Sequence, residues 1–172
     1  AQLRALSVSG RCSPFDNKAD GLVVGEGGCA FGLKRLTDAL NHGDTIFGVI
    51  AGIGLSNDRE GNLLLPASEG QLRAMRSAYE QAHWSPLEVS LFECHATGTP
   101  VGDSVEFASL RELLREAKPN HSAVIGSVKS TVGHLLTGAG SAGLAKVLLA
   151  IQNKILPPTA NFQAPSAKMN YN

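Results

Sequence analysis

Short apolar segments alternate with amphipathic helical segments along this chain of 172 residues. Residues 46–55, 89–93 and 123–128 are rich in aliphatic side chains, and turn-forming residues follow each of them, as they follow strands. Between them lie helical patterns, for example at 68–83, where apolar residues recur every three or four positions. Strands that alternate with helices predict an α/β fold with a largely parallel or mixed sheet and helices on both faces.

Further elements are predicted from capping signals and apolar runs. Asp103 and Glu106 have the spacing of a capping box, so a helix is expected from Asp103 to about Ala117. Ser68 and Gln71 have the same spacing at the start of the helix at 68–83. The other predicted elements are a buried strand at 29–33, a short helix or turn at 36–42, and an apolar helix from about 139 to 152.

Charge and cysteine content exclude several classes of function. The chain has 15 basic and 15 acidic residues, so it offers neither the basic surface of a nucleic-acid-binding protein nor a polybasic membrane anchor. No apolar run reaches the roughly 18 residues that a membrane-spanning helix needs. Its three cysteines, Cys12, Cys29 and Cys94, are too widely spaced for a disulfide framework or a metal site. We expect them to be small buried residues in a reducing, cytoplasmic protein.

Two segments share one plan: a strand, then a loop of small residues with one histidine, then a helix. His95 follows the strand at 89–93, and His134 follows the strand at 123–128. Ligands bind at the carboxyl edge of such sheets, so we expect the two imidazoles to lie within about 8 Å of each other, where both can stabilise one oxyanion. Lys129 is expected to add positive charge or to orient a carboxylate. The alternative is that each histidine is a hydrogen-bonded structural residue.

Four segments carry a resemblance to a known family. They are residues 11–21 (RCSPFDNKADG, continued by GEG at 25–27), 93–103 (ECHATGTPVGD), 126–134 (GSVKSTVGH) and 156–159 (LPPT). In order and spacing they resemble motifs of the β-ketoacyl synthases, the condensing domains of polyketide and fatty-acid synthases. Each block alone is a weak signal, but four in register are specific. The resemblance implies the thiolase-like fold, present here only in part, mostly as its C-terminal half.

The resemblance also implies a reaction and the residues that perform it. In the family an active-site cysteine holds the acyl chain as a thioester, and the carbanion from decarboxylation of a malonyl unit attacks it. His95 and His134 match the two histidines that assist the decarboxylation, and Lys129 matches the supporting lysine. The implied partners are an acyl carrier protein, acyl and malonyl thioesters, and a second copy of the full-length domain. Nucleic acid and membrane are not implied. Neither a cofactor nor a metal is implied, because the phosphopantetheine of the carrier protein brings the substrates.

Two parts of the family pattern are missing from the sequence. The nucleophilic cysteine of the family lies in an Ala-Cys-Ser-Ser elbow, which none of the three cysteines matches, and the closing Gly-Phe-Gly-Gly-Thr-Asn segment is absent. Residues 1–172 are therefore expected to be a central-to-C-terminal fragment of one β-ketoacyl synthase domain, inactive by itself. The residues Arg11, Asp16, Asp20 and Glu26 match a block that is expected to be mostly structural.

Two other functions stay open. One is a non-catalytic partner subunit, similar to the chain-length factors that shape a pocket beside a ketosynthase. Such relatives tend to lose the catalytic set, whereas His95, His134 and Lys129 are all present here. The other is a degradative thiolase, which the loop at 95–100 does not resemble. The residue in the nucleophile elbow, cysteine or not, discriminates between enzyme and partner subunit.

Overall fold

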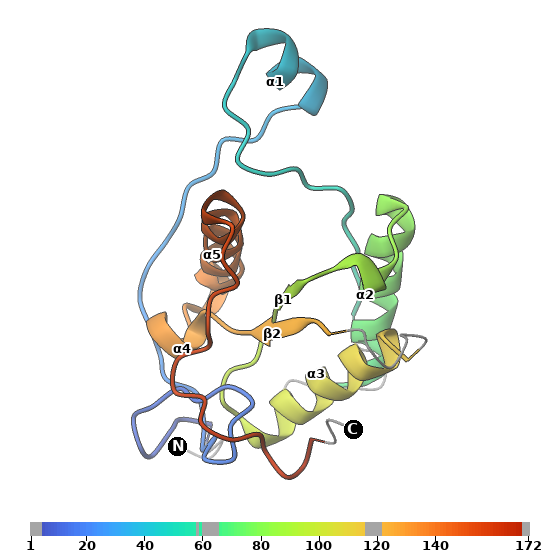
Figure 1. The fold of residues 1–172 in the computed structure, drawn as a ribbon. Coiled ribbons are helices and arrows are strands. Elements are labelled where there is room, and N and C mark those ends of the chain that lie inside the picture. Colours follow the sequence, from blue (N-terminus) through green and yellow to red (C-terminus); the bar gives the residue numbers. More distant parts are fainter. Residues whose placement is uncertain (1–4, 58, 60–65, 116–121, 170–172) are drawn as a thin grey trace.

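Two short parallel strands lie at the centre of the structure, a computed structural model that describes residues 5–57, 59, 66–115 and 122–169 (Figure 1). Strands β1 (Leu91–Glu93) and β2 (Val124–Gly126) pair in the register Leu91↔Val124, Phe92↔Ile125 and Glu93↔Gly126. Both lie inside the strands predicted at 89–93 and 123–128. The predicted α/β arrangement with parallel strands is confirmed, although each strand is shorter than expected.

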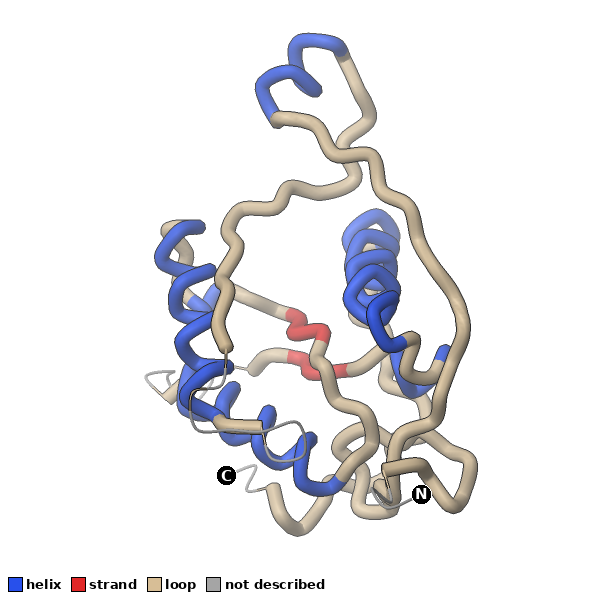
Figure 2. Tube along the Cα trace, turned by 180° about the vertical axis from the view of Figure 1, so that it is seen from behind, coloured by secondary structure: helices blue, strands red, loops and turns tan. Residues whose placement is uncertain are grey.

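Two other predicted strands form no sheet. Residues 29–33 and 46–55 run without a strand partner among the described residues, and most of their large apolar side chains are exposed. Helix α1 (Leu36–His42), which was expected as a short helix or turn, lies between these two segments at the far end of an excursion from the rest of the molecule (Figure 2). The prediction failed because a strand needs a hydrogen-bonding neighbour along its edge, and the described part of the chain provides none for these two segments.

One side of the segment at 46–55 is nevertheless covered by helix α2 (Ser68–Ala82). A Cβ atom added at Gly52 or Gly54 would collide with the α2 backbone at Ala78 or Ala74. The alternating glycines therefore let the backbone of the segment pack directly against the backbone of α2. Side chains on a strand-like segment alternate, and Ile53 and Leu55 remain exposed.

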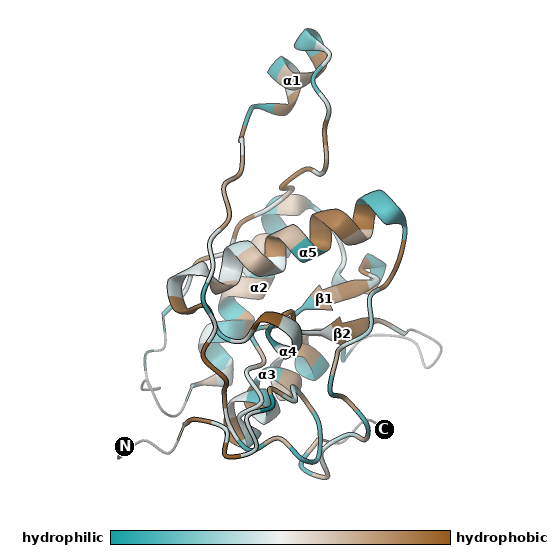
Figure 3. Cartoon of the chain, turned by 90° about the vertical axis from the view of Figure 1, so that its left-hand side faces the viewer, coloured by the Kyte–Doolittle hydropathy of each residue, from teal (hydrophilic) through white to brown (hydrophobic). Residues whose placement is uncertain are grey.

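The hydrophobic core lies on the α2 and α3 side of the two strands, and α3 (Pro100–Leu113) and α5 (Ala139–Asn153) flank the sheet on opposite sides (Figure 3). The predicted apolar helix at about 139–152 is thereby confirmed as α5. The core consists of Phe15, Cys94, Ala96, Leu110 and Met169, with Met75, Phe92, Phe107 and Ile125 packed against it. Because successive strand residues alternate, Phe92 joins this core and Glu93 turns to the opposite side, toward α5.

Both predicted capping boxes are wrong. Helix α3 begins at Pro100 with Thr99 as its N-cap, because the fixed φ of proline suits the first helical turn. Asp103 therefore lies inside that turn, and its carboxylate serves other backbone groups. The predicted end of this helix, near Ala117, lies outside the described residues. In α2 the hydroxyl of Ser68 bonds the Ser109 hydroxyl of α3 at 2.8 Å, and it caps nothing.

The segment at 11–21 is held by hydrogen bonds to two carboxylates, of which Asp16 is buried. Asp16 is 2% exposed and accepts hydrogen bonds from the backbone N–H groups of Lys18, Gln163 and Ala164 at 2.8, 2.6 and 3.0 Å. Asp20 accepts the Ser7 hydroxyl at 2.6 Å. These two residues are structural, as predicted. No described helix combines the length and apolarity that crossing a lipid bilayer requires.

Candidate active site

The two predicted histidines meet at the carboxyl ends of β1 and β2. The ring centroids of His95 and His134 are 5.3 Å apart, with the ring planes at 78° in an edge-to-face arrangement. The predicted convergence is therefore confirmed. One substrate atom can lie within hydrogen-bond reach of two imidazoles at this separation.

Glu106 positions the backbone at His95. Its two carboxylate oxygens accept the N–H groups of His95 at 2.6 Å and Ala96 at 2.7 Å. Burial raises the pKa of Glu106, while these two N–H groups lower it in part. The strand end that carries His95 is thereby clamped to α3.

Asp103, one turn earlier on α3, anchors the rest of the same loop. It is 1% exposed, and it accepts the N–H groups of Thr97 at 3.0 Å and Phe15 at 2.9 Å. Burial raises its pKa, against the opposing effect of its backbone donors. Both roles were missed from the sequence, where the two carboxylates were assigned to helix capping. A usable signal was present, since two acidic residues three apart follow a loop of Gly and Thr whose N–H groups need partners.

His134 is held by backbone bonds to the segment at 23–25. Its N–H donates to the Val23 carbonyl at 2.7 Å, and its own carbonyl accepts the Gly25 N–H at 3.1 Å. It follows the single turn α4 (Lys129–Val132) and then Gly133, whose φ is 74°. A Cβ atom at Gly133 would lie 2.9 Å from the Val23 carbonyl oxygen, so glycine is required there.

A backbone contact selects the tautomer of His134. The Leu136 N–H, at the start of the 3₁₀ turn η2 (Leu136–Gly138), donates to His134 Nδ1 at 3.0 Å. A nitrogen that accepts a hydrogen bond carries no proton, so the neutral ring carries its proton on Nε2. His134 can therefore act as a hydrogen-bond donor through Nε2.

The surroundings keep both rings neutral at pH 7. His95 is partly exposed to solvent. Desolvation by the surrounding protein atoms nevertheless lowers its pKa to about 4, and the electrostatic effects of Lys129 and then His134 act in the same direction. Desolvation and then Lys129 also lower the pKa of His134. Neutral imidazoles can donate an N–H to a developing oxyanion without first losing a proton.

Lys129 is the first residue of α4 and is 4% exposed. Burial lowers its pKa, and the carboxylates of Glu106 and Glu93 act in the opposite direction. Lys129, His95 and Glu93 line a cavity of about 320 Å³. The other lining residues are Cys94, Ala139, Gly140, Gly143, Leu144 and Val147. Lys129 and His95 thus line a cavity walled by α5, whereas His134 contacts His95 and is not among the lining residues.

The buried thiols are not activated. The Cys12 thiol donates to the Thr97 carbonyl at 3.3 Å, and burial, followed by the charge of Asp103, raises its pKa to about 11. Burial, followed by Glu106, raises the pKa of Cys94 well above its ordinary value. A nucleophilic cysteine needs a lowered pKa, so both are core residues, as predicted. Cys29 is exposed, and the prediction that it is buried was wrong because its segment lacks strand partners.

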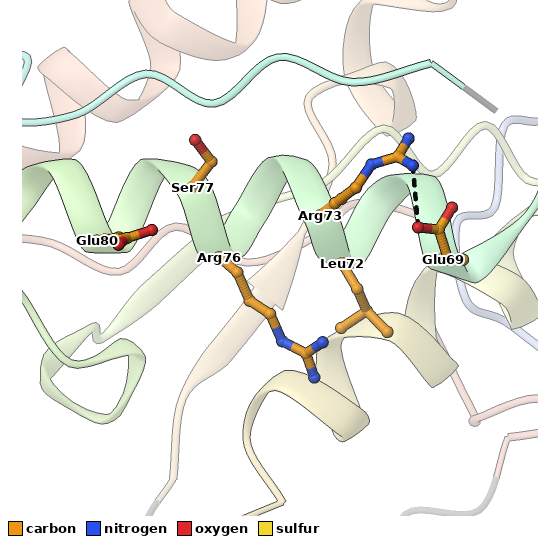
Figure 4. A pocket seen from close by; sticks show the side chains of 6 residues that line it. All are labelled: Glu69, Leu72, Arg73, Arg76, Ser77 and Glu80. Carbon is orange, nitrogen blue, oxygen red and sulfur yellow. Dashed lines mark hydrogen bonds and ion pairs between the residues drawn. The ribbon is translucent and has the colours of Figure 1, made fainter. Parts of the chain in front are cut away.

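A larger hollow, of about 460 Å³, runs along α2 and is separate from the histidines (Figure 4). All of its lining side chains come from this one helix: Glu69, Leu72, Arg73, Arg76, Ser77 and Glu80. Arg73 pairs with Glu69 at 3.0 Å, so charges on the wall compensate each other. Within the part of the chain that the structure describes, no three His, Cys, Asp or Glu residues are grouped to hold a metal ion.

Comparisons with known proteins agree with this geometry. The family model described as "Beta-ketoacyl synthase, C-terminal domain" matches residues 47–163, and the model described as "Beta-ketoacyl synthase, N-terminal domain" matches residues 1–39. The chain therefore belongs to the β-ketoacyl synthase family.

Relatives of known sequence are large synthases. The chain is 44% identical over 157 residues to a polyunsaturated fatty acid synthase of Thraustochytrium sp., across 89% of this chain and 6% of that protein. It is 42% identical over 164 residues to a phenolphthiocerol/phthiocerol polyketide synthase of Mycobacterium tuberculosis, across 94% of this chain and 9% of that protein. The chain thus spans less than a tenth of either relative.

Solved structures of ketosynthases have the same fold. The ketosynthase from module 6 of the bacillaene synthase from Bacillus subtilis 168 is 36% identical, with a TM-score of 0.90 over 99% of this chain and 31% of that chain. The ishigamide ketosynthase/chain length factor is 29% identical, with a TM-score of 0.89 over 97% of this chain and 40% of that chain. This likeness confirms the predicted thiolase-like, partial α/β fold.

Proposed function

We propose that the chain supplies the decarboxylation half of the active site of a β-ketoacyl synthase. This synthase condenses an acyl thioester with a malonyl-type thioester in polyketide or fatty-acid biosynthesis. The observation that carries the proposal is the pair of neutral imidazoles, with ring centroids 5.3 Å apart, one of which has its Nε2 proton fixed by a backbone donor. Two neutral donors this close together suit an oxyanion that exists only during the reaction.

The reaction uses these groups in the decarboxylation step. The bond between the malonyl carboxylate and its α-carbon breaks, its electron pair forms the enolate double bond, and negative charge develops on the thioester oxygen. His95 and His134 donate hydrogen bonds to that oxygen. The enolate carbon then attacks the acyl thioester carbonyl and expels the thiolate that held the acyl group. Lys129 supplies positive charge beside the site, while Glu106 and Asp103 hold the loop that carries His95.

The thiol that carries the acyl group is proposed to lie outside the described residues of this chain. Cys12 and Cys94 are buried with raised pKa values, which makes them poor nucleophiles, and none of the three cysteines, the exposed Cys29 included, lies in an Ala-Cys-Ser-Ser elbow. The 172-residue chain alone is therefore expected to be inactive. In the complete cytoplasmic enzyme the proposed partners are an acyl carrier protein, whose phosphopantetheine arm brings the substrates, and a second copy of the domain. The proposed chemistry uses no resident cofactor.

Replacement of His134 by Ala in the complete synthase tests this proposal. One lost oxyanion donor is expected to lower CO₂ release from malonyl carrier protein by about 10²–10³-fold. Loading of an acyl group onto the nucleophile, followed by intact-protein mass, should continue. The matched control is His83→Asn, because His83 is an exposed helix C-cap in the left-handed conformation that Asn tolerates. A folded His134→Ala variant that decarboxylates at the parental rate would remove His134 from the mechanism.

A second candidate is a partner subunit similar to a chain-length factor. It has specific support, since one of the similar structures is named as a ketosynthase/chain length factor. Retention of both histidines and Lys129 favours the enzyme. Acyl loading separates the two functions, because a partner subunit without a nucleophilic cysteine forms no acyl thioester.

A further inference from the structure

A partly buried ion pair lies beside the candidate site and has no role in the reaction as described so far. Glu93 is the last residue of β1, and Lys146 lies in the middle of α5. Lys146 Nζ is 2.6 Å from Glu93 Oε2, and the side chains are 14% and 10% exposed. The second carboxylate oxygen, Glu93 Oε1, accepts the Val128 N–H at 2.5 Å. One carboxylate therefore joins β1, the N-cap residue of α4, and α5.

The neighbouring residues leave space for this pair. A Cβ atom at Gly143 of α5 would lie 3.1 Å from Glu93 Cγ, so the glycine lets the acidic side chain lie against the helix. A Cβ atom at Gly126, opposite Glu93 in the β1–β2 register, would lie 3.3 Å from Lys146 Nζ and 2.7 Å from Thr159 Oγ1. The two glycines thus leave the room that the two charged side chains occupy between the strands and α5.

The carboxylate of the ion pair and its donor Val128 are close in sequence to the two catalytic candidates on which the inference depends. Glu93 lies two residues before His95 and points to the same side of the strand, while Val128 directly precedes Lys129. The bond from Val128 to Glu93 therefore determines where the α4 turn starts relative to the strand end. If the charge of Lys146 were removed, Glu93 would be a partly buried carboxylate without its ion-pair partner, and it would tend to turn toward water. That change would weaken its hold on Val128.

We propose that Glu93 and Lys146 are positioning residues for the condensation reaction, and that their ion pair sets the distance between Lys129 and His95. The inference rests on the proposed function, since it assigns a role within that reaction. Neither residue touches the reacting atoms. The pair acts through the α4 turn, where a displacement of about 1 Å is enough to lower a rate by about 10²-fold.

Two variants of the complete synthase test the proposal. Lys146→Met keeps the length of the side chain and removes the charge. It is expected to lower kcat for CO₂ release by about 10²-fold, to change KM for malonyl carrier protein by less than about threefold, and to leave acyl loading intact. The double variant Glu93→Gln/Lys146→Met removes both charges, while the Gln amide oxygen still accepts the Val128 N–H. It is expected to recover at least about tenfold of the lost kcat, because the neutral Gln side chain needs no cation at position 146.

The outcomes separate this inference from the proposed function. If His134→Ala abolishes CO₂ release while folded Lys146→Met retains the parental rate, the positioning role is overturned and the proposed function stands. Equal losses of CO₂ release and acyl loading in Lys146→Met would mean a general effect on folding, which also overturns the role. If Lys146→Met does not fold, the double variant provides the test. A double variant that loads acyl groups but releases no CO₂ counts against the proposal. If the unmodified complete synthase releases no CO₂ from malonyl carrier protein, the proposed function and the positioning role are both overturned.

Discussion

Gly133 offers the sharpest test of how the backbone positions His134. Its φ of 74° and ψ of −172° lie in a region that L-residues rarely adopt. A methyl group there would also lie 2.9 Å from the Val23 carbonyl oxygen and 3.0 Å from the Gly25 nitrogen. Conformational strain of about 1–3 kcal/mol and overpacking of about 1–3 kcal/mol give an expected cost of roughly 2–6 kcal/mol for Gly133→Ala.

This cost falls on the bonds that hold the catalytic candidate. The displaced carbonyl of Val23 is the acceptor of the His134 N–H at 2.7 Å, so relief of the clash moves the imidazole. A shift approaching 1 Å is expected to lower CO₂ release by about 10²-fold. The assays are CO₂ release by the complete synthase and hydrogen exchange at the His134 N–H, which should become faster in the variant.

Gly140→Ala is the matched control for stability. Gly140 lies in the first turn of α5, and a Cβ atom there meets nothing within 4 Å. Alanine is expected to leave the melting temperature unchanged or to raise it, because it favours the helix by about 0.5–1 kcal/mol. A Gly133→Ala synthase with parental melting temperature, parental exchange at His134 and parental CO₂ release would refute this reasoning.

Three further predictions concern buried charge, pH and thiol access. Asp16→Asn should cost about 1.5–3 kcal/mol of unfolding free energy, because the amide cannot accept all three backbone donors. Asp20 is more accessible to solvent, so Asp20→Asn should cost about 1 kcal/mol or less. Chemical denaturation of both variants measures the difference. The pKa of His95 is lowered to about 4 in the folded protein, so as the pH falls the imidazole takes up a proton in the unfolded chain before it does so in the folded one. Stability contributed by neutral His95 is therefore complete above pH 6.5 and declines toward pH 4. The acidic limb of the profile of CO₂ release against pH should lie below 6.5, because both histidines must be neutral and the pKa of each is lowered; a limb at or above 6.5 would contradict the assigned environments. Iodoacetamide at pH 8 should label the exposed Cys29 of the 172-residue chain within minutes and spare Cys12, as peptide mass mapping would show; equal labelling of the two thiols would contradict the burial of Cys12.

The sequence alone determined the parts of this protein that depend on short-range patterns. The helix at 68–83 was predicted from apolar residues at helical spacing, and it is present as α2. The meeting of His95 and His134 was also predictable, because parallel strands bring the loops at their carboxyl ends to one edge. The family assignment followed from four motifs whose order is itself a property of the sequence.

Only the tertiary structure decided which distant groups satisfy buried polar atoms. Glu106 has the spacing of a capping residue, yet its carboxylate holds the His95 and Ala96 N–H groups, because a buried N–H takes whichever acceptor the packing brings near it. Lys146 had a local signal, a single cation in an apolar helix, but its partner Glu93 is 53 residues away in the sequence. The segment at 46–55 has the composition of a strand and forms none, because strand pairing depends on a neighbour that no local pattern supplies.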